Sequence, residues 1–265
     1  MTREEIRDFF NSQIHDWDLA RKNFEALSLI KKKPFKIKDM EGWVQFNPAR
    51  AVSTLANLDK KTLEKRPCFL CECNRPKEQK KINIEDKWDL LVNPFPILPY
   101  HFTIASGNHS PQFFDLSAGM SLAETLQGMV VFFNGEGAGA SAPDHLHYQA
   151  VPMDSLPLIN VMEKGAADKI KLNFPFEFIL DTDHFESEDL PVNAYFWVNK
   201  EGKNRNLIIK RKAHRPEMFY LDPPYRRAVS PGAIDMAGVI VTPYEDDFNR
   251  INGSDIETIY KEVTL

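Results

Sequence analysis

A pair of histidines followed by a glutamine stands near the middle of the chain. His145, His147 and Gln149 alternate with Leu146 and Tyr148. Because alternate side chains of a β-strand share a face, a strand here would place both imidazoles and the amide on one side of a sheet. An imidazole that is partly unprotonated near neutral pH can act as a nucleophile or bind a metal ion. Burial of such a polar face without partners would cost free energy, so the pattern indicates a functional site.

A run of small residues precedes these histidines. The segment from Asn134 to Pro143 reads Asn-Gly-Glu-Gly-Ala-Gly-Ala-Ser-Ala-Pro. Small residues allow the backbone to approach a ligand closely, and successive backbone N–H groups can hold an anion. Asn134, Gly139 and Ser141 are therefore candidate contacts to a phosphate. Either feature alone, a glycine run or a histidine in a strand, is more often structural, and it is their combination that predicts a site.

Together the two features resemble the active-site signature of the histidine-triad (HIT-like) superfamily, Gly-Ala-Ser-x-Pro followed by His-x-His-x-Gln. The glutamine in the last position of the motif resembles the nucleotidyltransferase and phosphorylase branch of the superfamily, because the hydrolases usually have a third histidine at that position. This branch includes galactose-1-phosphate uridylyltransferase, diadenosine tetraphosphate phosphorylase and GDP-hexose phosphorylase. The resemblance implies that His147 is the nucleophile, that Gln149 holds the phosphoryl group and that His145 belongs to the same catalytic strand. Asp144, between Pro143 and His145, is an extra residue relative to the family pattern.

The same resemblance implies an α+β, HIT-like fold, which is an antiparallel sheet with flanking helices, internally duplicated. The order of elements between Trp88 and Pro152 matches one histidine-triad unit. From Tyr195 to Pro216 the chain repeats the strand, turn and strand of that unit, and residues 237–243 resemble the histidine strand without its histidines. We therefore expect an N-terminal helical segment at residues 1–40, a catalytic half at 41–153 and a degenerate second half at 154–265.

The N-terminal residues have the periodicity of an amphipathic helix. Apolar residues recur at helical spacing from Thr2 to about Leu27, and Thr2 with Glu5 has the spacing of a capping box. We expect this helix to pack on the sheet. The lysine run at Lys31–Lys33 is more typical of a solvated turn than of a recognition patch.

Two further residues are candidates through the resemblance. Arg50 follows a predicted strand and turn, where the family has a similar Pro-x-Arg element that places its arginine against phosphate. A guanidinium suits this role because it can donate to two phosphate oxygens at once, although by default Arg50 would be a surface residue. Asn93, in an Asn-Pro-Phe-Pro turn, resembles the family's asparagine near the nucleotide ribose, but an asparagine before proline is often only a turn former.

The chain also contains a Cys-x-x-Cys motif formed by Cys68 and Cys71. No thioredoxin-like pattern surrounds it, and a zinc ion would need two more nitrogen or sulfur ligands. His109 resembles the third zinc ligand of galactose-1-phosphate uridylyltransferases, and the first histidine of the pair, His145, resembles the fourth. The resemblance thus implies a structural zinc site with these four ligands and Cys73 as a spare. Diadenosine tetraphosphate phosphorylases lack this metal, so the presence of zinc stays open.

Composition limits the class of protein. The chain has 265 residues, of which 43% are hydrophobic and 27% charged, so it can bury a full core. A net charge of −5 argues against a general nucleic-acid-binding protein. No apolar run approaches the roughly 18 residues of a membrane span, and the charged N-terminus does not resemble a signal peptide. We expect a cytoplasmic protein, monomeric or homodimeric, that binds neither nucleic acid nor membrane.

The activity implied by the resemblance is double displacement at phosphorus. His147 would attack the α-phosphate of a nucleoside diphosphate sugar or a dinucleoside polyphosphate, and inorganic phosphate or a sugar phosphate would then remove the nucleotide. Residues 45–50 look closest to the GDP-hexose phosphorylases, which we rank first. Lys210, Arg211 and Arg215 could contact a phosphate, but a solvated strand end is the simpler interpretation. The alternatives are a HIT-type nucleotide hydrolase and a non-catalytic, zinc-stabilised nucleotide-binding module.

Overall fold

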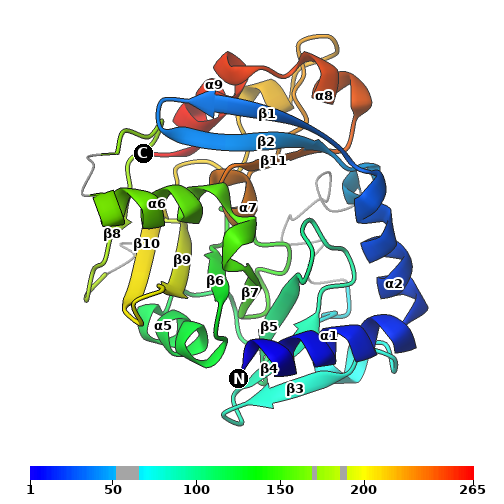
Figure 1. Cartoon of the computed structure of the whole chain (residues 1–265). Coiled ribbons are helices and arrows are strands. Elements are labelled where there is room, and N and C mark those ends of the chain that lie inside the picture. Colours follow the sequence, from blue (N-terminus) through cyan, green and yellow to red (C-terminus); the bar gives the residue numbers. More distant parts are fainter. Residues whose placement is uncertain (52–65, 169–171, 186–189) are drawn as a thin grey trace.

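Two β-sheets organise the chain (Figure 1). The structure, a computed structural model, describes residues 1–51, 66–168, 172–185 and 190–265. One sheet has eight strands in the order β3-β4-β5-β7-β6-β9-β10-β8, and the other has three in the order β1-β2-β11. All neighbours in the eight-stranded sheet are antiparallel, whereas β11 runs parallel to β2 in the smaller sheet.

The elements have the following bounds. The strands are β1 (Lys31–Ile37), β2 (Met40–Phe46), β3 (Lys81–Ile84), β4 (Trp88–Val92), β5 (Phe102–Ser106), β6 (Met129–Asn134), β7 (His147–Pro152), β8 (Ile179–Leu180), β9 (Val192–Val198), β10 (Asn204–Lys210) and β11 (Val239–Thr242). The helices are α1 (Arg3–Asp16), α2 (Asp18–Glu25), α5 (Leu116–Thr125), α6 (Pro157–Asp168), α7 (Ala233–Met236), α8 (Glu245–Arg250) and α9 (Gly253–Val263). Single 3-10 turns are η1 (Ala26–Leu29), η2 (Pro48–Arg50), η3 (Glu72–Asn74), η4 (Met153–Ser155) and η5 (Glu217–Phe219).

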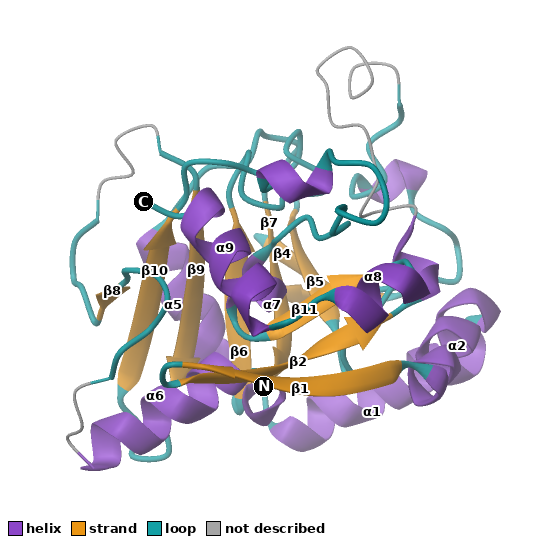
Figure 2. Cartoon of the chain, turned by 90° about the horizontal axis from the view of Figure 1, so that it is seen from above, coloured by secondary structure: helices purple, strands orange, loops and turns teal. Residues whose placement is uncertain are grey.

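The large sheet has a hydrophobic cluster on each face. On one face Phe132 and Trp197 pack with residues of β2, β11, α6 and α9. On the other face Tyr148 and Phe196 pack with residues of α1 and α5. Figure 1 shows the smaller sheet at the top of the view and α1 at the bottom, with strands of the large sheet between them, and Figure 2 shows the smaller sheet from above. Full burial of an apolar side chain of this size contributes about 2 kcal/mol, so the two clusters fix the large sheet as a central layer.

The N-terminal segment differs in part from its expected form. The capping box of Thr2 and Glu5 is present, but the helix is interrupted at Trp17, whose extended backbone separates α1 from α2. The lysine run does not form a turn. Residues Lys31–Lys33 lie in β1, where each pairs with a residue of β2. Lysines suit an edge strand such as β1, because their charge opposes pairing with another chain.

Strands of both expected halves join in one sheet. β6 from the first half pairs with β9 from the second, so the large sheet is continuous across the boundary expected at residue 153. β9 and β10 form the antiparallel pair that the repeat predicts. The expected counterpart of the histidine strand, β11, lies instead in the smaller sheet beside β2. The domain boundaries and the internal duplication therefore stay predictions, and the α+β, HIT-like expectation is taken up with the comparisons below.

None of the helices in the described ranges combines the length and the apolar composition that a membrane-spanning segment requires.

Candidate active site

His147 is the first residue of β7 and is buried, with 3% of its surface exposed. Its Nδ1–H donates to the backbone carbonyl of His145 at 2.8 Å, which leaves Nε2 without the proton. Burial lowers the pKa of His147 to about 4, so the ring is neutral near pH 7. A neutral imidazole with a fixed tautomer and an unprotonated Nε2 is the form that a nucleophile requires.

Gln112 fixes the position of this strand end. Its amide oxygen accepts from the backbone N–H of His147 at 2.9 Å, and its amide nitrogen donates to the His147 carbonyl at 2.9 Å. The same nitrogen donates to the carbonyl of Asn134 at 2.8 Å, so one side chain connects the ends of β6 and β7. No sequence pattern pointed to Gln112, because it lies in an irregular segment without periodicity.

Gln149 lies on the same face of β7 as His147, as the alternation predicts. Its amide oxygen is 2.7 Å from Nε2 of His101, a buried residue just before β5. Nδ1 of His101 accepts from the backbone N–H of Ile97 at 3.2 Å. His101 was not a candidate from the sequence, although the strand that follows it pairs in register with β7. Burial, with a smaller contribution from Arg50, lowers the pKa of His101 to about 3.

The low pKa of His101 predicts a pH-dependent stability. Below about pH 6.5 the unfolded chain binds a proton at this residue, whereas the folded protein does not bind one until about pH 3, so stability falls as the pH falls. Between about pH 7 and pH 5 this residue should remove about 2 kcal/mol from the free energy of unfolding. A His101→Gln variant should lack this contribution. Urea unfolding of both proteins over this pH range tests the prediction, which parallel pH profiles would contradict.

The glycine-rich loop, residues 135–146, is held by the second half of the chain. Gly139 has φ +98°, and its N–H donates to Nδ1 of His214 at 3.2 Å. Nε2 of His214 is 3.0 Å from the hydroxyl of Ser230. Within the described residues, the consecutive N–H groups of Ala140, Ser141 and Ala142 donate no hydrogen bond to the protein. Unpaired N–H groups are what an anion-binding loop needs, and the binding of an anion here stays a prediction.

Close packing at Gly139 gives a prediction about the loop. A Cβ on Gly139 would lie 2.5 Å from Cα of Gly232, so Gly139→Ala adds a backbone clash to the strain of a positive φ. We expect a loss of about 2–4 kcal/mol in the free energy of unfolding. Gly202→Ala is the matched control, because Gly202 has φ +77° and nothing within 4 Å of its added Cβ. It should lose only about 1 kcal/mol, and equal losses in urea unfolding would contradict the prediction.

Asn134 joins the two halves of the chain. Its Oδ1 accepts from Asn193 Nδ2 at 3.0 Å and from the backbone N–H of Ala233 at 2.7 Å. The Asn193 amide also donates to the carbonyl of Ala138 in the glycine-rich loop at 2.7 Å. The amide oxygen of Asn134 is therefore used to connect β6, β9 and α7. A contact from Asn134 to a phosphate stays a prediction.

The four expected metal ligands converge. Cys68, Cys71, His109 and His145 place one ligand atom each within 4.8 Å of one another. The two Nδ1 atoms are 3.3 Å apart, and Cys68 Sγ is 3.3 Å from His145 Nδ1. A tetrahedral zinc ion has ligand–ligand edges of about 3.3–3.8 Å. His145 Nε2 donates to the Ser106 carbonyl at 2.9 Å, which leaves Nδ1 available to a metal ion. The donor set and its spacing thus fit zinc.

The extra residue of the motif, Asp144, forms an ion pair with Arg66. Arg66 Nη2 is 3.0 Å from Asp144 Oδ1 and donates to the Ser141 carbonyl at 3.2 Å. The guanidinium also lies 4.8 Å from the ring centroid of Phe69, which belongs to the Cys-x-x-Cys segment. Arg66 therefore connects that segment to the glycine-rich loop. Ser141, which is exposed at this loop, keeps its predicted role as a phosphate contact.

Arg50 and Asn93 meet at the proline-rich turn after β4. Arg50 donates from Nη1 to the carbonyl of Phe95 at 2.8 Å. Burial lowers the pKa of Arg50 to about 10, while the nearby Asp235 opposes that shift. Asn93 Oδ1 accepts from the backbone N–H of Phe95 at 2.9 Å, which is the turn-forming role. The contacts of Arg50 and Asn93 with a phosphate or a ribose stay predictions.

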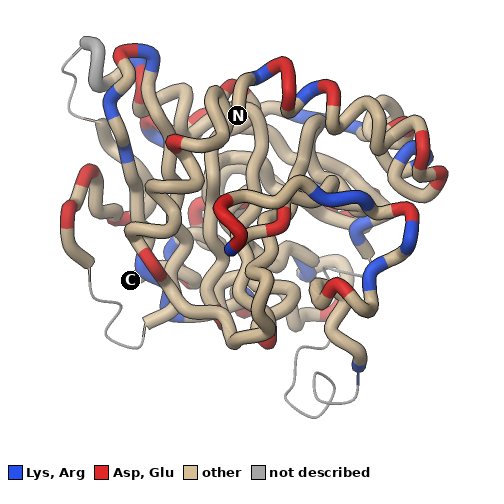
Figure 3. Tube along the Cα trace, turned by 90° about the horizontal axis from the view of Figure 1, so that it is seen from below, with Lys and Arg blue, Asp and Glu red and all other residues tan. Residues whose placement is uncertain are grey.

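The basic residues at the end of β10 have different surroundings. Arg211 is fully buried and donates to the carbonyls of Val263 at 3.0 Å and Pro231 at 3.1 Å. The expectation that it is solvated or contacts a phosphate is wrong, because its guanidinium satisfies carbonyl groups inside the fold. Figure 3 shows lysine and arginine interspersed with acidic residues along the trace. The β1 lysines follow this pattern, since Lys31 pairs with Glu245 and Lys36 with Glu41.

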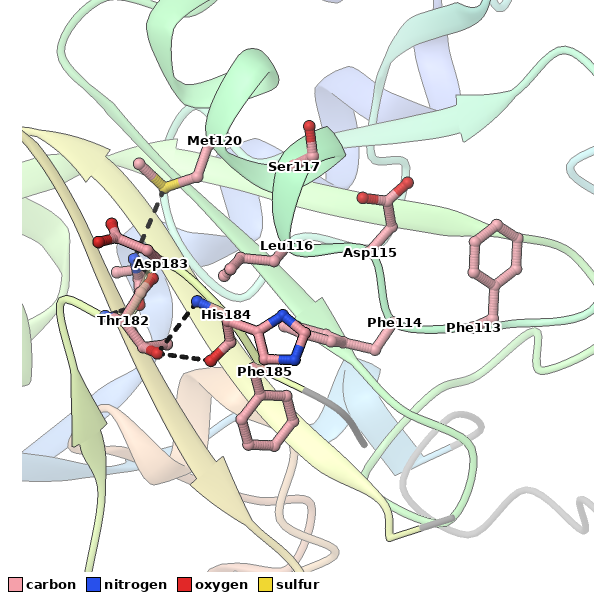
Figure 4. Close-up of a pocket in the computed structure, with 11 residues that line it drawn as sticks. Phe113, Phe114, Asp115, Leu116, Ser117, Met120, Thr182, Asp183, His184 and Phe185 are labelled. Atoms are coloured by element: carbon pink, nitrogen blue, oxygen red, sulfur yellow. Dashed lines mark hydrogen bonds between the residues drawn. The ribbon is translucent and has the colours of Figure 1, made fainter. Parts of the chain in front are cut away.

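A cavity of about 570 Å³ lies away from His147, between the start of α5 and residues 182–185 (Figure 4). Phe114 in its wall packs against Phe133 and Phe196, which belong to the cluster on the α5 face of the large sheet. His147 and Gln149 lie on the opposite face. This cavity is therefore separate from the candidate active site.

Comparison with known proteins supports the assignment of the fold. Diadenosine 5',5'''-P1,P4-tetraphosphate phosphorylase 2 of Saccharomyces cerevisiae is 25% identical over 185 residues, which cover 60% of this chain and 55% of the yeast protein. The chain thus spans about half the length of the curated relative it matches. The structure of yeast Ap4A phosphorylase Apa2 has a TM-score of 0.61 and 14% identity, covering 94% of this chain and 96% of that chain. Its complex with Ap4A has a TM-score of 0.61 and 16% identity, covering 100% of this chain and 99% of that chain.

These matches confirm the α+β, HIT-like fold and the resemblance to the nucleotidyltransferase and phosphorylase branch. A family model described as a domain of unknown function also matches residues 9–152. That range includes the Cys-x-x-Cys segment, the glycine-rich loop and the histidine strand, and it covers more than half of the chain. The protein therefore belongs to the family of the domain of unknown function DUF4922.

Proposed function

We propose that the protein is a phosphorylase that transfers a nucleotidyl group through a covalent bond to His147. The observation that carries the proposal is the state of His147, a buried neutral ring whose Nδ1–H is held by the His145 carbonyl. In the part of the chain that the structure describes, Nε2 of His147 has no hydrogen-bond partner. A buried nitrogen lone pair suits attack on a phosphorus centre, and the unpaired N–H groups of residues 140–142 are our proposed donors to its oxygens.

The proposed reaction has two displacements. In the first, Nε2 of His147 forms a bond to the α-phosphorus, and the bond from that phosphorus to the oxygen of the leaving group breaks. The imidazole then carries a positive charge, which the His145 carbonyl stabilises through Nδ1–H. In the second, an oxygen of inorganic phosphate or a sugar phosphate bonds to the phosphorus and the P–N bond breaks. The lone pair returns to Nε2, so the protein is unchanged at the end of the cycle.

Three groups of donors would stabilise the charge on the phosphorus oxygens. The Gln149 amide lies on the strand of the nucleophile, and the N–H groups of residues 140–142 come from the loop before it. Arg50, whose charge helps to lower the pKa of His101, is our proposed contact to the remaining phosphates. Such donors contribute most when they are already in place before the reaction, because no reorganisation is then needed.

We propose dinucleoside polyphosphates as the first donor to test and nucleoside diphosphate sugars as the second. The first choice follows the sequence relative named as a diadenosine tetraphosphate phosphorylase. The GDP-hexose preference, drawn from residues 45–50, stays a prediction. Two of these side chains serve the fold, since Gln45 donates to the Ile97 carbonyl at 3.1 Å and Asn47 is buried.

We also propose that the four converging ligands bind a structural zinc ion. Zinc would hold the Cys-x-x-Cys segment and His109 against His145, with Cys68 and Cys71 as thiolates. His145 is both a ligand in this set and the residue whose carbonyl holds the His147 ring. The ion would thus stabilise the backbone that orients the nucleophile. A cytoplasmic location and the choice between monomer and homodimer stay predictions.

The experiment is incubation of the purified protein with diadenosine tetraphosphate, with and without inorganic phosphate, followed by chromatography of the nucleotides. We expect ADP and ATP, with a rate that depends on phosphate. AMP and ATP at a rate independent of phosphate would support the hydrolase alternative. No conversion of this donor or of a panel of nucleoside diphosphate sugars would support the binding-module alternative and contradict the proposal.

A further inference from the structure

His101 is a buried residue that contacts the candidate site without being part of the sequence motif. It is 1% exposed and directly precedes β5, where Thr103 pairs with Gln149. Its two ring nitrogens have different partners, the backbone N–H of Ile97 on Nδ1 at 3.2 Å and the amide oxygen of Gln149 on Nε2 at 2.7 Å. His101 thus connects the proline-rich turn after β4 to the strand of the nucleophile.

These partners determine the tautomer of His101. A backbone N–H can only donate, so Nδ1 must accept from Ile97 and cannot carry a proton. The proton of the neutral ring is therefore on Nε2, which donates to Gln149. A donor on Nε2 requires an acceptor opposite, so the oxygen of the Gln149 amide faces His101. It follows that the NH₂ group of this amide faces away from His101.

The orientation of the amide decides what Gln149 can do. Its NH₂ group donates no hydrogen bond to any residue that the structure describes, and the side chain is only partly buried. An amide rotated by half a turn would present its oxygen, which repels a phosphate. An asparagine or glutamine side chain has no intrinsic preference between these two orientations, so the preference must come from a fixed neighbour.

We propose that His101 is a positioning residue that holds Gln149 with its NH₂ group directed at the transferred phosphoryl group. This inference rests on the proposed function, because it assigns a role within the same reaction. Loss of the hydrogen bond from His101 would let the amide rotate and would weaken one donor to the transition state. A single donor of this kind changes rates by about 10²–10³-fold, so we expect partial loss of it to slow nucleotidyl transfer by about 10–100-fold.

The test uses two variants that each keep one half of the His101 contacts. In His101→Asn the amide oxygen replaces Nδ1 as the acceptor for Ile97, but the side chain is too short to reach Gln149. In His101→Gln the amide nitrogen takes the place of Nε2 and can still donate to Gln149. Rapid-quench measurement of the nucleotide adduct should give a 10–100-fold lower rate for His101→Asn, and a rate within about threefold of wild type for His101→Gln. The donor concentration at half-maximal rate should stay nearly constant.

A Gln149→Ala background separates positioning from a general structural effect. If His101 acts through the amide, His101→Asn should cause no further loss of rate in this background. Equal additional losses in both backgrounds would overturn the proposal. So would a wild-type rate for His101→Asn, or a loss for His101→Gln as large as that for His101→Asn.

A second readout does not depend on substrate. Nitrogen NMR of the resting protein should find the His101 proton on Nε2, and a proton on Nδ1 would overturn the proposal. If the wild type forms no adduct with any donor, the proposed function fails and the positioning role of His101 fails with it. If the wild type forms the adduct and His101→Asn forms it equally fast, only the positioning role fails.

Discussion

Replacement of His147 by asparagine should abolish formation of the covalent nucleotide adduct. The Nδ2 amide of asparagine can take the place of Nδ1 and keep the hydrogen bond to the His145 carbonyl, but the variant has no atom at the position of Nε2. Removal of the nucleophile typically costs about 10⁴-fold or more in rate. We therefore expect no detectable adduct and a loss of phosphorolysis of at least about 10⁴-fold.

Intact-protein mass spectrometry checks this result. The protein is incubated with diadenosine tetraphosphate or a nucleoside diphosphate sugar and quenched at alkaline pH, which preserves a phosphoramidate. Wild type should gain the mass of one nucleotidyl group. His15→Ala is the control, because His15 is exposed at the end of α1 and far in sequence from the candidate site. It should form the adduct like wild type, and an adduct of undiminished yield on His147→Asn would show that another residue is the nucleophile.

Replacement of Cys68 by serine should remove the metal and destabilise the protein. Cys68 is buried and lies 3.3 Å from His145 Nδ1. Structural zinc contributes about 10–16 kcal/mol to the folding of isolated zinc fingers. In this protein the Cys-x-x-Cys segment is also supported by the large sheet, so loss of zinc should cost less than in an isolated zinc finger. We expect the free energy of unfolding to fall by about 4 kcal/mol or more. Transfer to His147 should slow as well, because His145 supplies the carbonyl that orients its ring.

Cys73 gives the matched control for this prediction. It is exposed, and it is not among the four ligands that converge. Cys73→Ser should therefore keep one equivalent of zinc by elemental analysis and unfold like wild type. A wild-type protein without metal, together with equal stability of the Cys68 and Cys73 variants, would contradict the zinc proposal. Retention of zinc by Cys68→Ser would contradict the expected loss of the metal.

The local pattern of the sequence determined the main parts of the candidate site. The alternation predicted His145, His147 and Gln149 on one face of a strand, and the structure has His147 and Gln149 on β7. His145 lies before the first residue of β7, so the expectation that it belongs to the same strand is wrong. The capping box at Thr2 also forms as predicted. Identification of all four metal ligands required the family resemblance, because the Cys-x-x-Cys spacing indicates only Cys68 and Cys71.

Other features depend on contacts between distant segments. Lys31–Lys33 looked like a turn because lysines are usually solvated, but pairing with β2 makes them part of a strand. Arg211 looked solvated, yet the carbonyls of Val263 and Pro231 surround it in the folded chain. Side-chain type gives a preference for burial or exposure, and long-range packing can reverse that preference.

The sequence by itself determined which residues are candidates for nucleotidyl transfer, since the identity and spacing of His147 and Gln149, and their resemblance to a family motif, are local properties. Only the tertiary structure decided how they are held. His101, just before β5, hydrogen-bonds the Gln149 amide, Gln112 fixes the start of β7, and His214 holds the glycine-rich loop from the second half of the chain. Each of these hydrogen bonds joins residues more than 30 positions apart. Such partners leave no periodic signal in the sequence, because their proximity arises from the order in which the strands pair.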